Sequence, residues 1–295
     1  MKFEKILFHT QFREYALNSL KALLRLKKAG LKEVVLVYII PREDVGFVPY
    51  GGYLKDVEKR IQLEAKSRFK DWQKTIHAAG IRSIIRIKTG ILNPSILKIA
   101  EEEKVDLIVT GAKKRTTFEK IYVGSHILDI LRRSQVPVLM GKYMVQFESG
   151  EGVLCRKNTR IFERPLLATD WSAPSERGLS AITALKGLVK SAVVIHIMDS
   201  KLIKGVDPSR VAEIEKESQR RLDAYSGRLQ AESIPAEIHI SIGKSVPEIL
   251  RISRETEATL IIMGKTGKDW MEQYWLGGVS HRVAELSELP VLLVP

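Results

Sequence analysis

The chain has almost no cysteine and no long apolar run. Its 295 residues include a single cysteine, Cys155, which excludes an internal disulfide framework and a metal site built from cysteines. No apolar stretch approaches the roughly 20 residues that a bilayer span requires. The N-terminal sequence MKFEKILFHT becomes charged too early for a signal peptide. These absences predict a cytoplasmic protein without membrane segments.

Familiar catalytic and metal-binding patterns are missing as well. The six histidines do not have metal-ligand spacing, and no nucleophile elbow G-x-S-x-G occurs. The triplet Gly264-Lys265-Thr266 resembles part of a Walker loop, but that motif needs an earlier glycine where this chain has Thr259. The sequence therefore predicts no catalytic residue and no protein metal site, although Mg²⁺ could accompany a bound triphosphate.

Charge is distributed unevenly along the chain. The net charge is +13, and residues 1–150 contain 28 lysines and arginines against 16 acidic residues. Residues 151–295 contain 20 against 19. A basic first half could attract nucleic acid, anionic lipid or nucleotide phosphates, or could be a solvated surface. No aromatic RNA-binding strand or zinc-finger spacing occurs, which argues against nucleic acid.

An internal repeat organises the chain. Three pairs of residues recur at one offset of 153 positions: Gly111 and Gly264, Gly124 and Gly277, and Pro137 and Pro290. This regularity predicts a tandem duplication, with domains at residues 1–142 and 164–295. Residues 143–163 break the periodicity, and we interpret them as the linker.

Each half alternates between two hydrophobic periods. In the first half, short apolar runs typical of strands alternate with amphipathic patterns typical of helices, the last of which we expect Asn93 to cap. The expected strands are 5–10, 33–40, 83–90, 105–112 and 136–140, and the expected helices include 16–30, 57–80 and 93–104. The second half repeats the order, with strands at 165–170, 191–198, 236–243, 258–265 and 289–295. The alternation predicts an α/β fold with a doubly wound, five-stranded parallel sheet in each half.

A ligand site is expected at one edge of the second sheet. Ligands of open parallel sheets bind outside the carboxyl ends of the strands. Asp170 follows the first strand there and can accept hydrogen bonds from a ribose hydroxyl or a base amino group. Gly264 and Gly267 permit a close backbone approach, and the pair Gly277–Gly278 precedes a helix whose N-terminus suits phosphate. Lys265 either neutralises phosphate, together with Lys268, or lies on the solvated surface.

The glycine spacing carries a resemblance to a known family. The pattern G-x2-G-x9-G after the fourth strand of the second half resembles the universal stress protein family, and the match covers both halves, so the chain is similar to tandem members. The resemblance implies a Rossmann-like sheet of order 3-2-1-4-5 in each domain. It also implies that the two domains pair through their last strands as a pseudo-dimer. A bound adenine nucleotide (ATP, ADP or AMP) and a homodimer of tandem chains are further implications.

The resemblance transfers site residues unevenly. Gly278 stands where the family usually has Ser or Thr, so one hydroxyl donor is lost. In the first half, Thr10 stands where the acid is expected, and Lys114 replaces the second glycine. We therefore expect the nucleotide mainly in the second half and a degenerate site in the first. The implied second-half residues are Ala168, Thr169, Asp170, Ile197, Met263, Gly264, Gly267, Gly277, Gly278, Val279 and Ser280, and the first-half residues are Thr10, Ile39, Gly111, Gly124, Ser125 and His126.

The functional hypothesis is a nucleotide-binding regulatory or sensor protein of the stress response. Two alternatives stay open at this point. One is a slow ATPase or phosphotransfer protein, and the other is a nucleotide-free module that binds an unidentified protein partner.

Overall fold

The computed structural model describes residues 1–46, 55–111, 125–142, 144–149, 152–265 and 278–295, and both halves alternate strands and helices. The first-half strands are β1 (Lys5–His9), β2 (Glu33–Pro41), β3 (Arg82–Gly90), β4 (Leu107–Gly111) and β5 (Val138–Gly141). The second-half strands are β8 (Pro165–Thr169), β9 (Ala192–Asp199), β10 (Ala236–Gly243), β11 (Leu260–Gly264) and β12 (Val291–Val294). The first-half helices are α1 (Ala16–Leu23), the 3₁₀ helix η1 (Leu24–Ala29), α2 (Arg42–Val45), α3 (Lys55–Ala78), α4 (Leu92–Glu102) and α5 (Ser125–Arg133). The second-half helices are α6 (Ala173–Ala184), α7 (Ser200–Ile203), α8 (Pro208–Ala231), α9 (Ser245–Glu255) and α10 (Gly278–Leu286).

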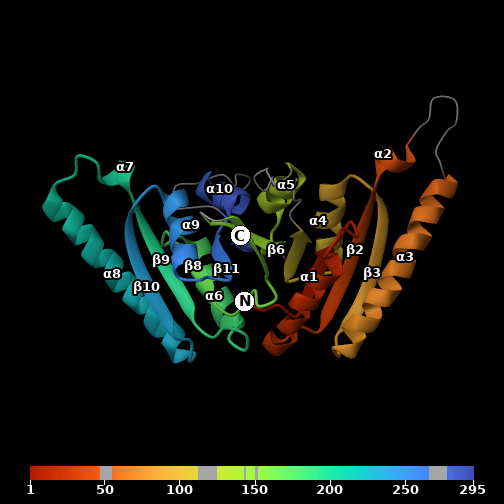
Figure 1. The fold of residues 1–295 in the computed structure, drawn as a ribbon, viewed down its shortest axis with the longest axis horizontal. Helices are drawn as coiled ribbons and strands as arrows, with labels where there is room; N and C mark the ends of the chain where they lie inside the picture. The colour runs from red at the N-terminus through yellow and green to blue at the C-terminus, as the bar shows by residue number, and fades with distance from the viewer. Residues whose placement is uncertain (47–54, 112–124, 143, 150–151, 266–277) are drawn as a thin grey trace.

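The two halves share one sheet of ten strands, in the order β10-β9-β8-β11-β12-β5-β4-β1-β2-β3. Within each half the neighbouring strands are parallel, and their order is the expected 3-2-1-4-5. At the junction β12 pairs antiparallel with β5, with Leu292 opposite Leu139. The predicted pairing through the last strands is therefore confirmed. Figure 1 shows the result, with α8 at one end of the molecule and α3 at the other.

Helices cover both faces of the sheet. One core cluster joins the strands to α1, α3, α6 and α8, and the other joins them to α4, α5, α9 and α10. Both clusters contain residues of both halves, because the sheet continues across the junction. Strands covered on both faces read as continuous apolar runs, and residues 34–37 of β2 are accordingly without exposed surface.

Two helix ends test the sequence signals. Gly30, the last residue of the helix expected over 16–30, ends η1 in the left-handed region, at φ 97°. Asn93 does not cap α4, so that prediction is wrong. The cap residue is Ile91, and the buried amide of Asn93 instead donates to Asp129 Oδ2 (3.1 Å) on α5. The Asn93 side chain therefore joins α4 to α5 and does not cap α4, although its local sequence preference favours the cap position.

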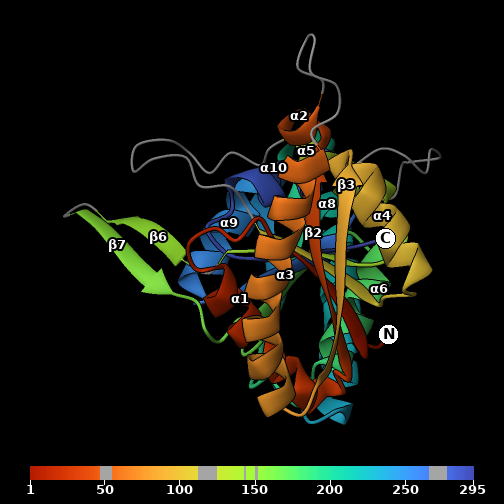
Figure 2. The ribbon, with the colours of Figure 1, turned by 90° about the vertical axis from the view of Figure 1, so that its right-hand side faces the viewer.

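The segment expected as a linker contains a β-hairpin. Strands β6 (Met144–Ser149) and β7 (Gly152–Lys157) pair antiparallel, with Phe147 opposite Leu154. Figure 2 shows this hairpin projecting from the side of the ten-stranded sheet. Its two short strands lack the βα alternation of the rest of the chain, so the repeat pattern does not reveal them.

A lysine is buried where the two halves meet. Lys142, directly after β5, is 5% exposed, and its ammonium group donates to the carbonyl oxygens of Ala284 (3.3 Å) and Ser287 at the end of α10. Burial lowers the pKa of Lys142 to about 7. A charged amine in a dry junction costs stability unless it is well compensated.

The substitution Lys142→Met tests this cost through pH. Because the pKa of Lys142 is about 7 in the folded chain and 10.5 ordinarily, the unfolded state binds more protons between these values. The free energy of unfolding therefore gains up to about 1.4 kcal/mol per pH unit from this group as pH rises through that window. Chemical denaturation of both proteins at about pH 8 and about pH 10 measures the gain, which Lys142→Met is expected to lose. Equal pH dependence in the two proteins would contradict the burial argument.

Candidate functional site

A cavity of about 730 Å³ lies at the carboxyl ends of β8, β9 and β11. The first turns of α9 and α10 and one side of α8 complete its wall. Nine of the eleven residues expected in the second half line it: Ala168, Thr169, Asp170, Ile197, Met263, Gly264, Gly278, Val279 and Ser280. Gly267 and Gly277 lie outside the described residues. The parallel sheet explains the convergence, because its strand ends meet at one edge.

Asp170 forms the turn between β8 and α6. Its Oδ1 accepts hydrogen bonds from the backbone N–H (3.1 Å) and hydroxyl (2.5 Å) of Ser172 and from the hydroxyl of Ser175. Burial raises the pKa of Asp170, but these hydrogen bonds outweigh it, so the pKa lies below its ordinary value. Among the described residues no donor reaches Oδ2. Asp170 thus holds Ser172, the N-cap of α6, with one oxygen and presents an ionised acceptor with the other.

Trp171 is a cavity residue that the sequence pattern did not indicate. Its backbone is left-handed (φ 67°), and its N–H donates to Thr169 Oγ1 (3.1 Å). The ring lies 4.7 Å from the ring of His196 and 5.5 Å from that of Tyr225, and the guanidinium of Arg221 lies 5.7 Å from its centroid. Nδ1 of His196 donates to the Thr169 carbonyl (2.8 Å), since a carbonyl oxygen only accepts. The rings of Trp171 and His196, with that of Tyr225 packed against Trp171, thus form the wall of the cavity between β8, β9 and α8.

The glycine side of the cavity combines the end of β11 with the start of α10. Met263 and Gly264 contribute from the strand, and Gly278, Val279 and Ser280 begin the helix. The first N–H groups of a helix lack intrahelical acceptors and carry the positive end of its dipole. The Ser280 hydroxyl donates its proton to the Lys265 carbonyl (2.8 Å) and does not direct it to a ligand. Backbone N–H groups are therefore the donors that the start of α10 offers to an anion.

Lys265 departs from both sequence expectations. Its ammonium group donates to the carbonyl oxygens of Arg132 (3.0 Å) and Ser134 (3.1 Å) in the first half. The residue is 7% exposed, and burial lowers its pKa. It is neither a surface lysine nor a neutraliser of phosphate, because the antiparallel junction places the opposing half beside it. Lys268 lies outside the described residues.

Helix α8 lines the opposite side of the cavity with paired charges. Arg210 pairs with Glu213 (2.6 Å) and Arg221 with Glu217 (2.8 Å), so each arginine is already compensated. Among the described lining residues, four carboxylates face two guanidinium groups: Asp170, Asp199, Glu213 and Glu217 against Arg210 and Arg221. The sequence indicates the helix, but the tertiary packing decides which of its faces meets the cavity. The start of α10 is thus electropositive, the charges on α8 are paired with one another, and the two remaining carboxylates, Asp170 and Asp199, lie at the ends of β8 and β9.

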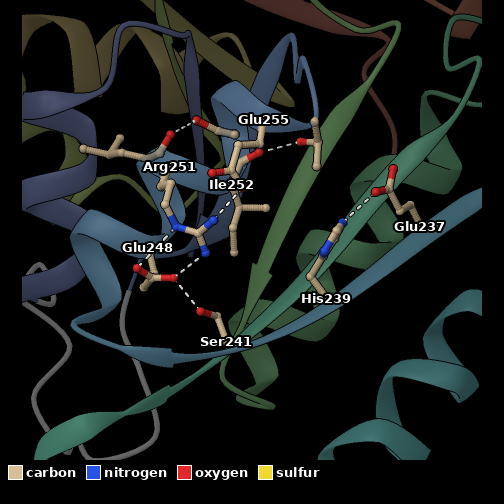
Figure 3. A network of polar contacts seen from close by, with 10 residues as sticks. Glu237, His239, Ser241, Glu248, Arg251, Ile252 and Glu255 are labelled. Carbon is tan, nitrogen blue, oxygen red and sulfur yellow. Dashed lines mark hydrogen bonds and ion pairs between the residues drawn. The ribbon is translucent and has the colours of Figure 1, made fainter.

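A polar network holds α9, which supplies Ser245 and Ile249 to the cavity. Glu248 accepts hydrogen bonds from the Ser241 hydroxyl on β10 and from the Arg251 guanidinium (2.7 Å). Figure 3 shows Glu248 pointing toward both partners, with Arg251 also reaching Glu255. The network fixes α9 against the end of β10 and so sets the position of the two cavity residues.

Strand register corrects one first-half assignment. Phe8 lies opposite Val109 of β4, and Leu167 lies opposite Ile262 of β11, the repeat counterpart of Val109. Thr10 is therefore the counterpart of Thr169, and its Oγ1 likewise accepts the N–H two residues on, at 2.9 Å. The expectation that Thr10 replaces Asp170 is wrong by one residue. Gln11 stands at that position, so the acid is absent from the first half as expected.

The other first-half candidates do not converge on a described cavity. Ile39 is fully buried in β2, Gly111 ends β4, and Ser125 and His126 begin α5, while Gly124 lies outside the described residues. A second cavity of about 660 Å³, between α2, α3 and the end of β3, is lined by none of them.

The described part of the chain contains no group of three or more His, Cys, Asp or Glu side chains able to hold a metal ion. None of the helices described has the length and apolar composition of a membrane span.

Comparisons with known proteins identify relatives of both halves. A sequence profile of the universal stress protein family matches residues 2–142 and again residues 162–295. The universal stress protein MJ0577 of Methanocaldococcus jannaschii is 29% identical over 154 residues, covering 48% of this chain and 95% of that protein. YxiE, a universal stress protein of Bacillus subtilis, is 26% identical over 147 residues, covering 45% of this chain and 99% of that protein.

Solved structures match the whole chain. A universal stress protein from Archaeoglobus fulgidus has a TM-score of 0.74 and 23% identity, covering 100% of this chain and 99% of that one. A second structure, described as a putative universal stress protein from Pseudomonas aeruginosa, has a TM-score of 0.68 and 16% identity, covering 99% and 93%. At these identities the likeness concerns the fold.

The substitution Asp170→Asn tests the support that Asp170 gives to Ser172, the N-cap of α6. An amide oxygen accepts the Ser172 and Ser175 hydrogen bonds more weakly than a carboxylate, so the variant is expected to lose about 1 kcal/mol of unfolding free energy. The loss should fade in acid, because the low pKa of Asp170 makes its contribution present at neutral pH and lost as pH falls through that value. Urea denaturation at neutral and acidic pH measures both effects. A loss that is equal at both pH values would contradict the role of the ionised carboxyl.

Proposed function

Because the chain belongs to the universal stress protein family, with a match in each half, we propose that it binds an adenine nucleotide in the second-half cavity and has a regulatory or sensor role. The observation that carries this proposal is the convergence of four separate segments on one cavity. The ends of β8, β9 and β11 and the start of α10 supply acceptor, apolar and anion-binding groups to the same space. Its volume of about 730 Å³ falls in the range of roughly 300–1,000 Å³ typical of small-molecule sites.

The chemistry of the walls favours one orientation of the nucleotide. Ala168, Ile197 and Met263 offer apolar contact to a base. Oδ2 of Asp170 accepts hydrogen bonds from ribose hydroxyls, and the N-terminal N–H groups of α10 suit the phosphates. On the α8 side, Arg210 and Arg221 are already paired with carboxylates, which favours phosphate at the unpaired N–H groups of α10 instead.

We propose one nucleotide per chain. The first half has Gln11 at the position of Asp170 and Lys114 at the position of the second glycine, so it lacks the acidic acceptor. ATP, ADP and AMP all fit the proposed contacts. Mg²⁺ would enter with a triphosphate, since the described residues contain no metal-binding group of their own. Cytoplasmic location and a homodimer of tandem chains stay predictions.

Binding measurements on a matched pair of variants test the proposal. Asp170 and Asp207 both stabilise the start of a helix, but only Asp170 lines the cavity. Asp170 acts through Ser172, the N-cap of α6, whereas Asp207 is itself the N-cap of α8 and accepts from the N–H of Ser209 (2.8 Å). Isothermal titration with AMP, ADP and ATP is expected to give one site per chain. Asp170→Asn should weaken binding about tenfold or more, because it removes a charged acceptor, and Asp207→Asn should leave it unchanged.

Several results would contradict the proposal. Wild-type protein that binds none of the three nucleotides, and releases none on denaturation, would favour the nucleotide-free interaction module. Two sites per chain would overturn the asymmetry between the halves. Equal weakening in both Asp variants would show that helix capping, not ligand contact, explains the effect.

A further inference from the structure

The two buried lysines cross the junction in opposite directions. Lys142 extends from the first half to the end of α10, and Lys265 extends from the second half to the end of α5. Among the described residues neither ammonium group has a carboxylate within ion-pair distance. Glu288, whose charge acts on Lys142, is itself paired with Arg254 (2.9 Å). Both lysines therefore compensate the carbonyl groups that a helix leaves unpaired in its last turn.

Helix α10 connects Lys142 to the candidate nucleotide site. Its first three residues line the cavity. At its other end, the carbonyl oxygens of Ala284 and Ser287 accept hydrogen bonds from Lys142. A helix of nine residues is about 14 Å long, and it transmits the position of one end to the other because it is stiff. Figure 1 shows α10 and α5 close together over the middle of the sheet, where each can be reached from the opposing half.

The charge that Lys142 carries below its pKa of about 7 acts along the same helix. A cation at the C-terminus of a helix offsets the negative end of its dipole. With the negative end of the dipole offset, the potential at the N-terminus of α10 is more positive, and an anion there binds more tightly. Lys265 has no such effect on the cavity, since its ammonium group lies at the end of α5.

We propose that Lys142, a residue of the first half, is a positioning residue for the phosphate of the nucleotide bound in the second half, and that it acts through α10. This inference rests on the proposed nucleotide site. It gives the tandem arrangement a specific consequence, because the anion-binding helix of one half is anchored by the other. It also explains why a destabilising buried charge stands at this position.

A pair of isosteric substitutions tests the proposal. Lys142→Met and Lys265→Met each remove a buried ammonium group from the same junction and keep a similar side-chain volume. Titration calorimetry with AMP at about pH 6, where Lys142 is charged, is expected to show about fivefold weaker binding for Lys142→Met. Binding is expected to stay within about twofold of wild type for Lys265→Met. Thermal denaturation of both variants records the purely structural cost.

Adenosine serves as the probe without phosphate. If Lys142 acts on the phosphate, adenosine binds wild type and Lys142→Met equally. Should Lys142→Met fail to fold, Lys142→Gln replaces it, because the amide keeps one donor to the carbonyl groups and removes the charge. The expected result for Lys142→Gln is the same selective loss of AMP affinity.

Each alternative outcome is distinguishable. Equal loss of AMP affinity in the Lys142 and Lys265 variants, or equal loss of AMP and adenosine affinity, would overturn the positioning role while leaving the nucleotide site intact. Unchanged AMP affinity in Lys142→Met would do the same. Absence of AMP binding to wild type, with ADP and ATP also failing to bind, would instead reject the proposed function itself.

Discussion

The antiparallel pairing of β5 with β12 is the interaction on which the rest of the structure depends. It joins two parallel sheets into one and lets each hydrophobic core continue from one half into the other. It also places the last turn of α5 beside Lys265 and the last turn of α10 beside Lys142. Two amines that would otherwise lie in water are buried there, each on unpaired helix carbonyl groups.

The candidate site follows from the parallel order within each half. Strands β8, β9 and β11 end at the same edge, and the loops that leave them carry an acid, an apolar group and a glycine to one cavity. The walls differ in charge because two helices approach from different directions. α10 presents its N-terminus, whereas α8 presents a side on which arginines and carboxylates are paired with one another.

The two halves keep one scaffold and differ in the groups it presents. Phe12 and Trp171 both have left-handed backbones after the first strand, and both stack in a ring cluster with an arginine nearby. The preceding residue is Gln11 in one half and Asp170 in the other. Because a neutral amide does not replace an ionised acceptor, the duplicated fold supports a different capacity for binding in each half.

Much of this protein is determined by sequence alone. The alternating periods specify the βα order, and the repeat specifies two similar halves. The family resemblance that the glycine spacing supports implies nine of the residues that line the cavity. These signals are local, since each depends on neighbours in the chain or on a fixed offset.

Strand register, the side of each helix that faces the cavity, and the burial of side chains were decided by tertiary structure. The Thr10 assignment was wrong by one residue because strand pairing sets the register. The roles expected for Asn93 and Lys265 were wrong because both side chains form hydrogen bonds at α5, which is distant in the chain. Trp171, the face of α8 and the buried Lys142 became visible only when packing brought together residues that are far apart in the chain.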